Sequence, residues 1–369
     1  MEMLRPVWAE VDLGVLKRNY NRIKTYTNSE VMPVVKADAY GHGAIPVVKA
    51  LWEVGAKRFG VALLEEGIEL RQVFKDIDIM VIGAVPMEYA DILVEHNIIP
   101  EIFQYEQAKA LSNAAVKRAS IARLHLKIDT GMGRIGFKTS EVEEILKIGK
   151  LPGLMIEGIY THFATADQKD LTFARDQLRR FTDFCNLLEK NGLKIPLRHA
   201  SNSAAVMQVQ EAHMNLVRPG IILYGLPPSA QVGMNAGFEP VLSWKARVAH
   251  VKTIETGESV GYGRTFKAAF PTKVATIPVG YADGLRRALS NRGEVLIHGM
   301  RSTIIGRVCM DQAMLEVTKI PDVKIGDIVT ILGTDGNDRI DASEMANLVG
   351  TINYEILCGI SKRVPRKYL

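Results

Sequence analysis

The stretch EVMPVVKADAYGHGA (30–44) decides how the rest of the chain is interpreted. Its first residues form a β-branched, nearly uninterrupted apolar run, which is typical of a parallel strand covered on both faces. Lys36 ends this run, and a loop with two glycines follows it. Because burial disfavours the charged amine, a lysine at this position is a candidate nucleophile toward aldehydes. The alternative is a lysine whose amine extends to solvent at the end of its strand.

Similar apolar runs recur as far as Gly225 and predict strands separated by helices. We expect strands over 30–36, 58–62, 78–83, 98–102, 121–128, 154–162, 196–200 and 215–223. The clearest helix is predicted over 173–192, where one face carries Phe173, Leu178, Phe181, Phe184 and Leu188. Eight strands alternating with helices are the pattern of a (β/α)8 barrel, and a doubly wound open sheet is the alternative.

The polar residues at the strand ends favour the barrel. Lys36, Asp129, His162 and Ser201 fall at or just after the ends of the first, fifth, sixth and seventh predicted strands. In a barrel these ends meet on one rim, whereas an open sheet would spread them along an edge.

After Gly225 the pattern changes. Residues 226–240 are rich in turn residues and indicate a linker. The segments that follow alternate in polarity and are separated by Gly and Asp, with one convincing helix in DASEMANLVG (341–350). We therefore predict an α/β protein with an N-terminal (β/α)8 TIM-type barrel domain over 1–235 and a smaller, mostly β C-terminal domain over 236–369.

Composition narrows the class of protein. The 369 residues are 47% hydrophobic and 24% charged, and 46 Lys and Arg against 41 Asp and Glu give a formal net charge of +5. No basic run suggests nucleic acid or a membrane surface as a partner. The N-terminus lacks the apolar stretch of a signal peptide, and the three cysteines form no metal-binding or disulfide pattern. We expect a cytoplasmic protein without a bound metal.

The segment LHLKIDTGMGRIGF (124–137) contains a G-x-G-x-x-G spacing, which by itself is a weak sign of a dinucleotide site. Glu157 lies at the expected distance but inside its predicted strand, and Arg134 lies within the glycine loop. We therefore do not favour NAD. Lys127 lies two residues before Asp129, and the structural interpretation is an inward ion pair with Asp129 or with another carboxylate.

Two further groups of motifs carry polar side chains. Barrels commonly bind phosphate at the loops after strands seven and eight, and here these loops contain Ser201, Asn202, Ser203 and Gly220, with Arg218 beside them. In the β domain, Tyr262 lies between two glycines, which favours an exposed side chain at a turn. A tyrosine that only supports its hairpin is the alternative.

Together these motifs resemble the alanine racemases, a fold-type III family that uses pyridoxal 5′-phosphate. The resemblance runs nearly from end to end of the chain. It rests on AEVDL, VVKADAYGHG, HLKIDTGMGRIG, THFATAD, ASNSAAV, VRPGI, VGYGRTF, PVGYADG, VCMDQ and NYEILC, in this order.

The resemblance implies a set of site residues. Lys36 would hold the cofactor as a covalent aldimine. The phosphate and ring would be bound by Tyr40, Arg134, His162, Asn202, Ser203, Arg218, Gly220, Ile221 and Tyr354. The substrate would be bound by Arg134, Tyr281, Met310 and Asp311. Lys127 matches a lysine that is carbamylated in some members of the family.

The resemblance also implies a two-base interconversion of L- and D-alanine. Lys36 would act on one face of the substrate, and Tyr262 of the partner subunit on the other, so that active sites are shared in a homodimer. A hydrogen-bonded line from Tyr262 through His162 to Arg218 would make this phenol a competent base.

Three alternatives stay open at this point. They are a racemase of broader specificity that includes serine, a fold-type III decarboxylase acting on a basic amino acid, and a barrel that carries the cofactor without turnover. The β domain argues against the carrier, and VGYGRTF and VCMDQ argue against the decarboxylase. A biosynthetic role in supplying D-alanine for peptidoglycan and a catabolic role are both compatible with the residues.

Overall fold

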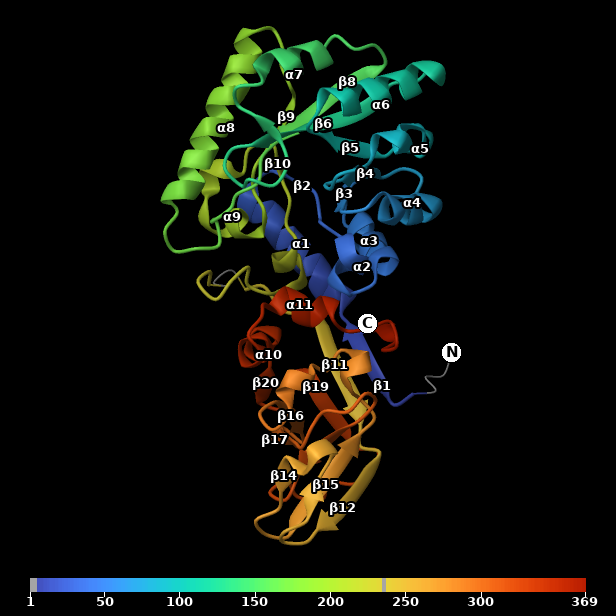
Figure 1. Cartoon of the computed structure of the whole chain (residues 1–369), viewed down its shortest axis with the longest axis vertical. Coiled ribbons are helices and arrows are strands. Elements are labelled where there is room, and N and C mark those ends of the chain that lie inside the picture. The colour runs from blue at the N-terminus through green and yellow to red at the C-terminus, as the bar shows by residue number, and fades with distance from the viewer. Residues whose placement is uncertain (1–4, 234–236) are drawn as a thin grey trace. The chain divides into compact units, whose positions relative to one another are not determined.

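The computed structural model describes residues 5–233 and 237–369 and divides into two compact units (Figure 1). One unit contains residues 16–39 and 44–238, and the other contains residues 5–15, 40–43 and 239–369. The boundary predicted between residues 235 and 236 lies outside the described residues.

The first unit is a (β/α)8 barrel. Its eight strands are β2 (Glu30–Val31), β3 (Arg58–Val61), β4 (Asp78–Val81), β5 (Ile99–Ile102), β6 (Ala122–Asp129), β8 (Leu154–Tyr160), β9 (Leu197–His199) and β10 (Leu216–Val217). All pairings are parallel, and the spatial order follows the sequence order from β3 to β9. Backbone hydrogen bonds from Gly60 to Pro33 and from Arg218 to Ser201 complete the ring. The barrel prediction is confirmed, and the open-sheet alternative is wrong.

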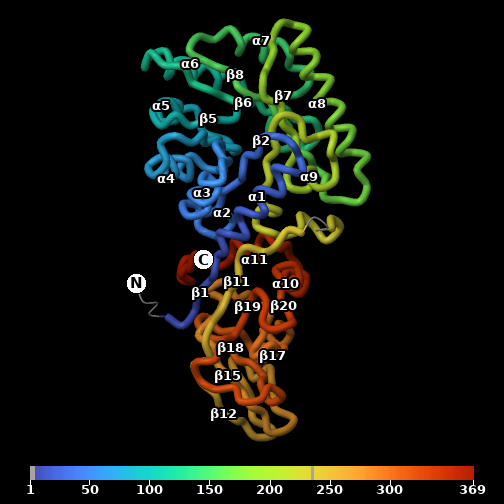
Figure 2. Tube along the Cα trace, turned by 180° about the vertical axis from the view of Figure 1, so that it is seen from behind, coloured from blue at the N-terminus to red at the C-terminus, as the bar shows by residue number. Residues whose placement is uncertain are grey.

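Helices connect the strands on the outside of this ring (Figure 2). They are α3 (Ala44–Glu53), α4 (Leu64–Val73), α5 (Ala90–Glu95), α6 (Tyr105–Lys117), α7 (Val142–Ile148), α8 (Thr172–Lys190) and α9 (Ser203–Gln208), with α1 (Leu13–Thr27) before the first strand. Helix α8 buries Leu178, Phe181, Phe184 and Leu188, as its spacing predicts. Phe173, at the start of the helix, is exposed instead.

The last predicted barrel strand is wrong in its length. Strand β10 ends at Val217, and Ile221–Tyr224 form a 3₁₀ turn, η3. Pro219 has no amide hydrogen for a strand ladder, and Gly220 accepts the first hydrogen bond of the turn from Leu223. Apolar character alone therefore predicted too long a strand here.

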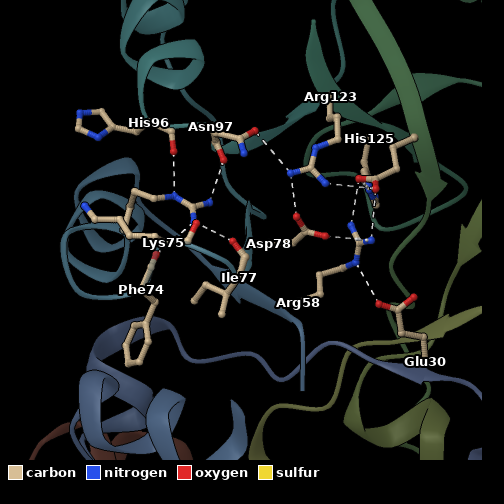
Figure 3. A network of polar contacts seen from close by, with 12 residues as sticks. Glu30, Arg58, Phe74, Lys75, Ile77, Asp78, His96, Asn97, Arg123 and His125 are labelled. Atoms are coloured by element: carbon tan, nitrogen blue, oxygen red, sulfur yellow. Dashed lines mark hydrogen bonds and ion pairs between the residues drawn. The ribbon is translucent and has the colours of Figure 1, made fainter. Parts of the chain in front are cut away.

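Charged residues gather where the barrel strands begin (Figure 3). The buried guanidinium of Arg58 donates to Glu157 at 3.0 and 3.2 Å and to Glu30 at 3.2 Å. Asp78 forms ion pairs with Arg58 at 3.3 Å and Arg123 at 2.7 Å. The network joins five strands, β2, β3, β4, β6 and β8, through side chains.

The free energy of unfolding should depend on pH through Glu157. Burial acts to raise its pKa, but the hydrogen bonds from His125 and Arg58 outweigh burial and lower that pKa to about 2. A carboxylate whose pKa falls on folding stabilises the native state above its ordinary pKa of 4.5 and loses that contribution as the pH falls toward 2. Between pH 5 and pH 3, the free energy of unfolding should therefore fall more for the wild type than for Glu157→Gln. Urea unfolding at several pH values measures this, with the exposed Glu88→Gln as control; equal slopes for wild type and Glu157→Gln would contradict it.

The second unit is mostly β, as predicted. Its main sheet contains β1 (Val7–Val11), β11 (Leu242–Arg247), β12 (His250–Ile254), β15 (Thr272–Ile277), β16 (Glu294–Ile297), β17 (Met300–Ile305), β18 (Ala313–Glu316), β19 (Ile328–Asp335), β20 (Asp338–Ile340) and β21 (Arg366–Tyr368). Strand β1 was expected in the first domain, but it pairs antiparallel with β11 and parallel with β21.

Two helices accompany this sheet. The predicted helix is present as α10 (Ala342–Val349), and α11 (Asn353–Cys358) was not predicted because six residues are too few to show helical periodicity. Strands β13 (Ser259–Val260) and β14 (Phe266–Lys267) form a separate hairpin. Of the helices formed by residues 5–233 and 237–369, none has both the length and the apolar character needed to span a bilayer.

Candidate active site

Lys36 follows β2 at the carboxyl end of the barrel strands, and an unusual turn begins directly after it. This turn, α2 (Lys36–Tyr40), has φ angles of 52°, 53°, 54° and 54° at Ala37, Asp38, Ala39 and Tyr40. A left-handed conformation costs an L-residue about 1–2 kcal/mol, so four in succession require support from outside the turn. The glycine-containing loop predicted here is thus an ordered left-handed turn that fixes the backbone next to Lys36.

Arg218, which follows β10, is held by three acceptors. Its guanidinium donates to Nδ1 of His199 at 2.9 Å and to the carbonyls of Thr161 at 2.9 Å and Ala200 at 3.1 Å. Burial lowers the pKa of Arg218 to about 10, so the guanidinium stays charged at neutral pH. A permanent cation is therefore fixed at the carboxyl end of the barrel.

A line of hydrogen bonds runs from Arg218 along the inside of the barrel to the charged network. Nε2 of His199 lies 2.8 Å from Nδ1 of His125, and Nε2 of His125 lies 3.2 Å from Glu157. Arginine can only donate and an ionised carboxylate can only accept, so the two ends assign both tautomers. Each imidazole accepts at Nδ1 and donates at Nε2. Both histidines are fully buried, and burial lowers both of their pKa values, which favours the neutral rings this line needs.

This line is distinct from the one expected from the sequence, which runs from Tyr262 of a partner subunit through His162 to Arg218 and stays a prediction. The acceptor of Arg218 described here is the ring of His199. Neither His199 nor His125 could be singled out from the residues alone, because a histidine within an apolar strand has no motif that reveals its partner.

Tyr160 lies at the centre of the charged side chains inside the barrel. Its ring stacks on His199 at 4.7 Å, with Nζ of Lys127 4.3 Å and Cζ of Arg218 4.8 Å from the ring centroid. Its hydroxyl donates to the buried carboxylate of Glu101. Burial and the charge of Arg218 lower the pKa of Lys127 to about 7, although Glu101 opposes this shift. Lys127 is therefore neutral in a large fraction of molecules near pH 7. Its amine contacts the Tyr160 ring, and of the carboxylates with which an ion pair was expected, Glu101 acts on its pKa more than Asp129 does.

The pKa of His162 shows that the carboxyl end of the barrel carries an excess of basic side chains. Burial, followed by the charges of Arg218, Lys127, Arg134 and Lys36, holds the pKa of His162 well below its ordinary value. Four basic side chains, of which Lys127 is only partly charged near pH 7, thus act on one imidazole. Such a concentration of positive charge at the mouth of a barrel suits a ligand that carries phosphate and carboxylate groups.

The glycine loop after β6 is shaped by its own aspartate. Asp129 accepts hydrogen bonds from the backbone N–H groups of Gly131 at 2.9 Å and Gly133 at 3.1 Å. Amides bonded in this way are not available to a pyrophosphate. This agrees with the expectation that the glycine loop is not an NAD site. Arg134 lies exposed in this loop.

The structure brings two of the predicted phosphate ligands together. The hydroxyl of Ser203 accepts a hydrogen bond from the N–H of Gly220 at 2.8 Å, and the neighbouring Ile221 is buried. Asn202 caps helix α9 by accepting from the N–H of Ala205 at 3.0 Å. Its amide oxygen therefore has a structural task that the sequence did not indicate.

In the second unit, the predicted phosphate ligands Tyr40 and Tyr354 are neighbours, with ring centroids 6.0 Å apart. Burial raises the pKa of Tyr40 well above its ordinary value, so this phenol keeps its proton and can donate a hydrogen bond. The pair is a suitable donor site for an anionic group.

Glycines allow close backbone contact between the segments of this unit that carry Tyr262, Tyr281 and Met310. A Cβ on Gly280 would lie 2.3 Å from the carbonyl oxygen of Cys309, and Tyr281 donates its N–H to that oxygen at 3.0 Å. A Cβ on Gly306 would lie 2.8 Å from the carbonyl of Val260, close to the turn that carries Tyr262. Only residues without a side chain permit these contacts.

The side chains carried by these segments face solvent. Tyr262 is 70% exposed, and Met310 and Tyr281 are also exposed. Asp311 is paired with Arg363 at 2.6 Å. An exposed phenol and thioether at positions held by close backbone packing are available to a molecule outside this chain.

The fold combines a parallel barrel with a mostly β domain. In the barrel, Lys36 follows the first strand and Arg218 follows the eighth. Residues 11–228 match the family profile described as the N-terminal domain of alanine racemase, and residues 241–368 match the profile of its C-terminal domain. The chain belongs to the alanine racemase family.

Relatives and solved structures agree over the full length. The alanine racemase of Carboxydothermus hydrogenoformans is 48% identical, with 99% of this chain and 100% of the relative covered, and that of Halothermothrix orenii is 45% identical, with 99% and 97% covered. The structure of alanine racemase from Clostridium difficile 630 matches with a TM-score of 0.95 at 38% identity, over 100% of this chain and 97% of the other. That of the Bacillus anthracis enzyme with bound L-Ala-P gives 0.93 at 37% identity, over 100% and 96%.

Proposed function

We propose that this protein interconverts L-alanine and D-alanine with pyridoxal 5′-phosphate bound at Lys36. The observation that carries the proposal is the placement of Lys36 and the fixed Arg218 at one end of the barrel, among cations that all act on His162. Membership of the alanine racemase family and the L-Ala-P ligand named for the Bacillus anthracis structure support it.

The residues present fit this cofactor. Its phosphate ester needs hydrogen-bond donors and positive charge. The hydroxyl of Ser203, which accepts from the N–H of Gly220, still has its own proton to donate, and the surrounding cations supply the charge. Its aldehyde needs an amine, which Lys36 provides, and its ring nitrogen can accept a hydrogen bond from Arg218. When bound, the cofactor supplies a conjugated ring that stabilises negative charge at the substrate Cα.

The cofactor ligands are proposed as the resemblance implies them. Lys36 would bind the aldehyde carbon, Arg218 the ring nitrogen, and His162 the face of the ring. The phosphate would be bound by Tyr40, Asn202, Ser203, Tyr354 and the N–H groups of Gly220 and Ile221. Arg134 would neutralise the substrate carboxylate, with Tyr281, Met310 and Asp311 shaping the space around it.

Racemisation requires two groups that hold or accept a proton on opposite faces of Cα. We assign the amine of Lys36 to one face and the phenol of Tyr262 from a partner subunit to the other, in a homodimer. The exposure of Tyr262 within its own chain supports this assignment, because a side chain destined for another subunit faces outward.

Lys127 is proposed as a site of carbamylation. Its pKa of about 7 leaves the neutral amine that attacks carbon dioxide. The nitrogen–carbon bond forms, one proton is released, and the product carries a negative charge that can orient Arg134. A carbonyl signal after incubation of the protein with ¹³C-bicarbonate, absent in Lys127→Ala, tests this step.

The function is tested on the purified protein supplied with pyridoxal 5′-phosphate. We expect D-alanine and L-alanine to reach a one-to-one mixture from either side, measured by chiral chromatography. Cofactor binding without turnover would instead support a carrier, and loss of carbon dioxide from lysine, ornithine or arginine would support a decarboxylase. Serine as a second substrate distinguishes a racemase of broader specificity.

The line from Arg218 to Glu157 predicts a role for His199 in this reaction. His199→Leu removes the acceptor of the charged Arg218 hydrogen bond, which is worth about 1.5–3 kcal/mol, so racemisation should fall roughly ten- to hundredfold. His199→Asn keeps an acceptor near the position of Nδ1 and should lose less. Steady-state rates of both variants, alongside thermal unfolding, check this order; equal losses in the two variants would show that the hydrogen bond to Arg218 is not the cause.

A further inference from the structure

Glu66, in the first turn of α4, has a carboxylate fully engaged by backbone N–H groups. One oxygen accepts from Ala37 at 2.6 Å, and the other accepts from Ala62 at 2.8 Å and Leu63 at 3.2 Å. The contacts to Ala62 and Leu63 cap helix α4. The contact to Ala37 has no role in that cap, because Ala37 belongs to a different segment of the barrel.

Ala37 is the residue that begins the left-handed turn after Lys36. It and Asp38 are exposed, so side-chain packing does not hold them in this conformation. The hydrogen bond from the N–H of Ala37 to Glu66 holds the start of the turn, and Asp38 accepts from the N–H of Ala44 at 2.7 Å at its other end. Two carboxylates thus support a backbone that L-residues rarely adopt.

We propose that Glu66 is a positioning residue for Lys36, which holds the left-handed backbone after this lysine and thereby fixes the direction of its amine. The inference rests on the proposed function in taking Lys36 as the residue that binds the cofactor. It assigns to Glu66 a task beyond capping its own helix.

Glutamine is an informative replacement at this position. Glu66 uses both oxygens as acceptors, whereas the side-chain amide of glutamine has one acceptor and one donor group. The single acceptor of Glu66→Gln cannot serve the turn and the helix cap at the same time, so each contact is made only part of the time. Glu65→Gln makes the same chemical change at an exposed neighbour in the same helix and serves as the matched control.

The first measurement uses the full chain without cofactor. Hydrogen–deuterium exchange of the peptides covering 36–44 and 60–66 should become at least several-fold faster in Glu66→Gln and stay unchanged in Glu65→Gln. Unchanged exchange in both variants would overturn the proposal. Because no cofactor is needed, this result does not depend on the proposed reaction.

The second measurement asks whether the turn is the reason for a functional loss. With pyridoxal 5′-phosphate, Glu66→Gln should lower kcat about tenfold with little change in KM, and slow the appearance of the bound-cofactor absorbance. Ala37→Gly removes the cost of a positive φ at this residue. The double variant Glu66→Gln/Ala37→Gly should therefore regain much of the lost rate.

The double variant separates positioning from capping. If Glu66 served only to cap α4, glycine at position 37 would restore nothing, and the proposal would be wrong. If the wild-type chain neither binds the cofactor at Lys36 nor racemises alanine, the proposed function fails, while the exchange measurement still decides whether Glu66 holds the turn.

Discussion

Replacing Lys36 by alanine is expected to abolish the racemisation of alanine, with a loss of at least about 10⁴-fold in kcat, because it removes both the cofactor's attachment point and one proton-moving group. The structure offers no second amine in an equivalent position among its described residues. Lys127 is the other lysine whose charge acts on His162, but it lies on β6 and contacts the Tyr160 ring.

Two readouts distinguish attachment from general damage to the fold. Reduction with borohydride followed by peptide mass mapping should place the cofactor on Lys36 in the wild type and on no residue in Lys36→Ala. The exposed Lys49→Ala, on α3, should behave as the wild type in both activity and labelling. Full labelling of Lys36→Ala at another lysine would contradict the assignment.

Replacing Tyr262 by phenylalanine is expected to lower racemisation by about 10²–10⁴-fold, the range for removal of a positioned acid or base. Exchange of the α-proton of L-alanine with deuterated solvent should be lost, while exchange from D-alanine through Lys36 is retained. The exposed Tyr89→Phe is the control for loss of a phenol on the surface. Wild-type exchange from L-alanine in Tyr262→Phe would show that this residue is not the second base.

Mixing the two inactive variants tests whether the phenol comes from a partner subunit. In a mixed dimer of Lys36→Ala and Tyr262→Phe, one site receives an intact lysine and an intact tyrosine from different chains. Random exchange of subunits should then restore about a quarter of the wild-type activity. If both groups act within one chain, every site lacks one of them and the mixture stays inactive.

The sequence was sufficient for the barrel because its strands are short, apolar and regularly spaced. All eight predicted runs contain a barrel strand. The first was predicted to residue 36, whereas β2 ends at Val31, and the end of the last was misjudged at Pro219, where a backbone donor is missing. The N-terminal strand β1 was misplaced because its partners, β11 and β21, lie far along the chain, and no local pattern reports such a pairing.

Candidate site residues could be singled out from the sequence where a recognisable motif contains a reactive or charged side chain, as at Lys36 and Arg218. The groups that hold these residues could not be predicted. His199, His125 and Glu66 act through hydrogen bonds between distant strands and helices, and each looks ordinary in its own segment. The left-handed turn after Lys36 was missed because alanine, aspartate and tyrosine do not favour that backbone, which tertiary contacts impose.

The pairing of strand β1 also affects the order in which the two units can fold during translation. Of the described strands, β1 is made first, yet one neighbour in its sheet, β11, is about 230 residues away, and the other, β21, follows all the other described strands. The barrel can close while translation continues, since all its strands are complete by then. Strand β1 has to wait unpaired until β11 has emerged, and its second edge is covered only when β21 has been made.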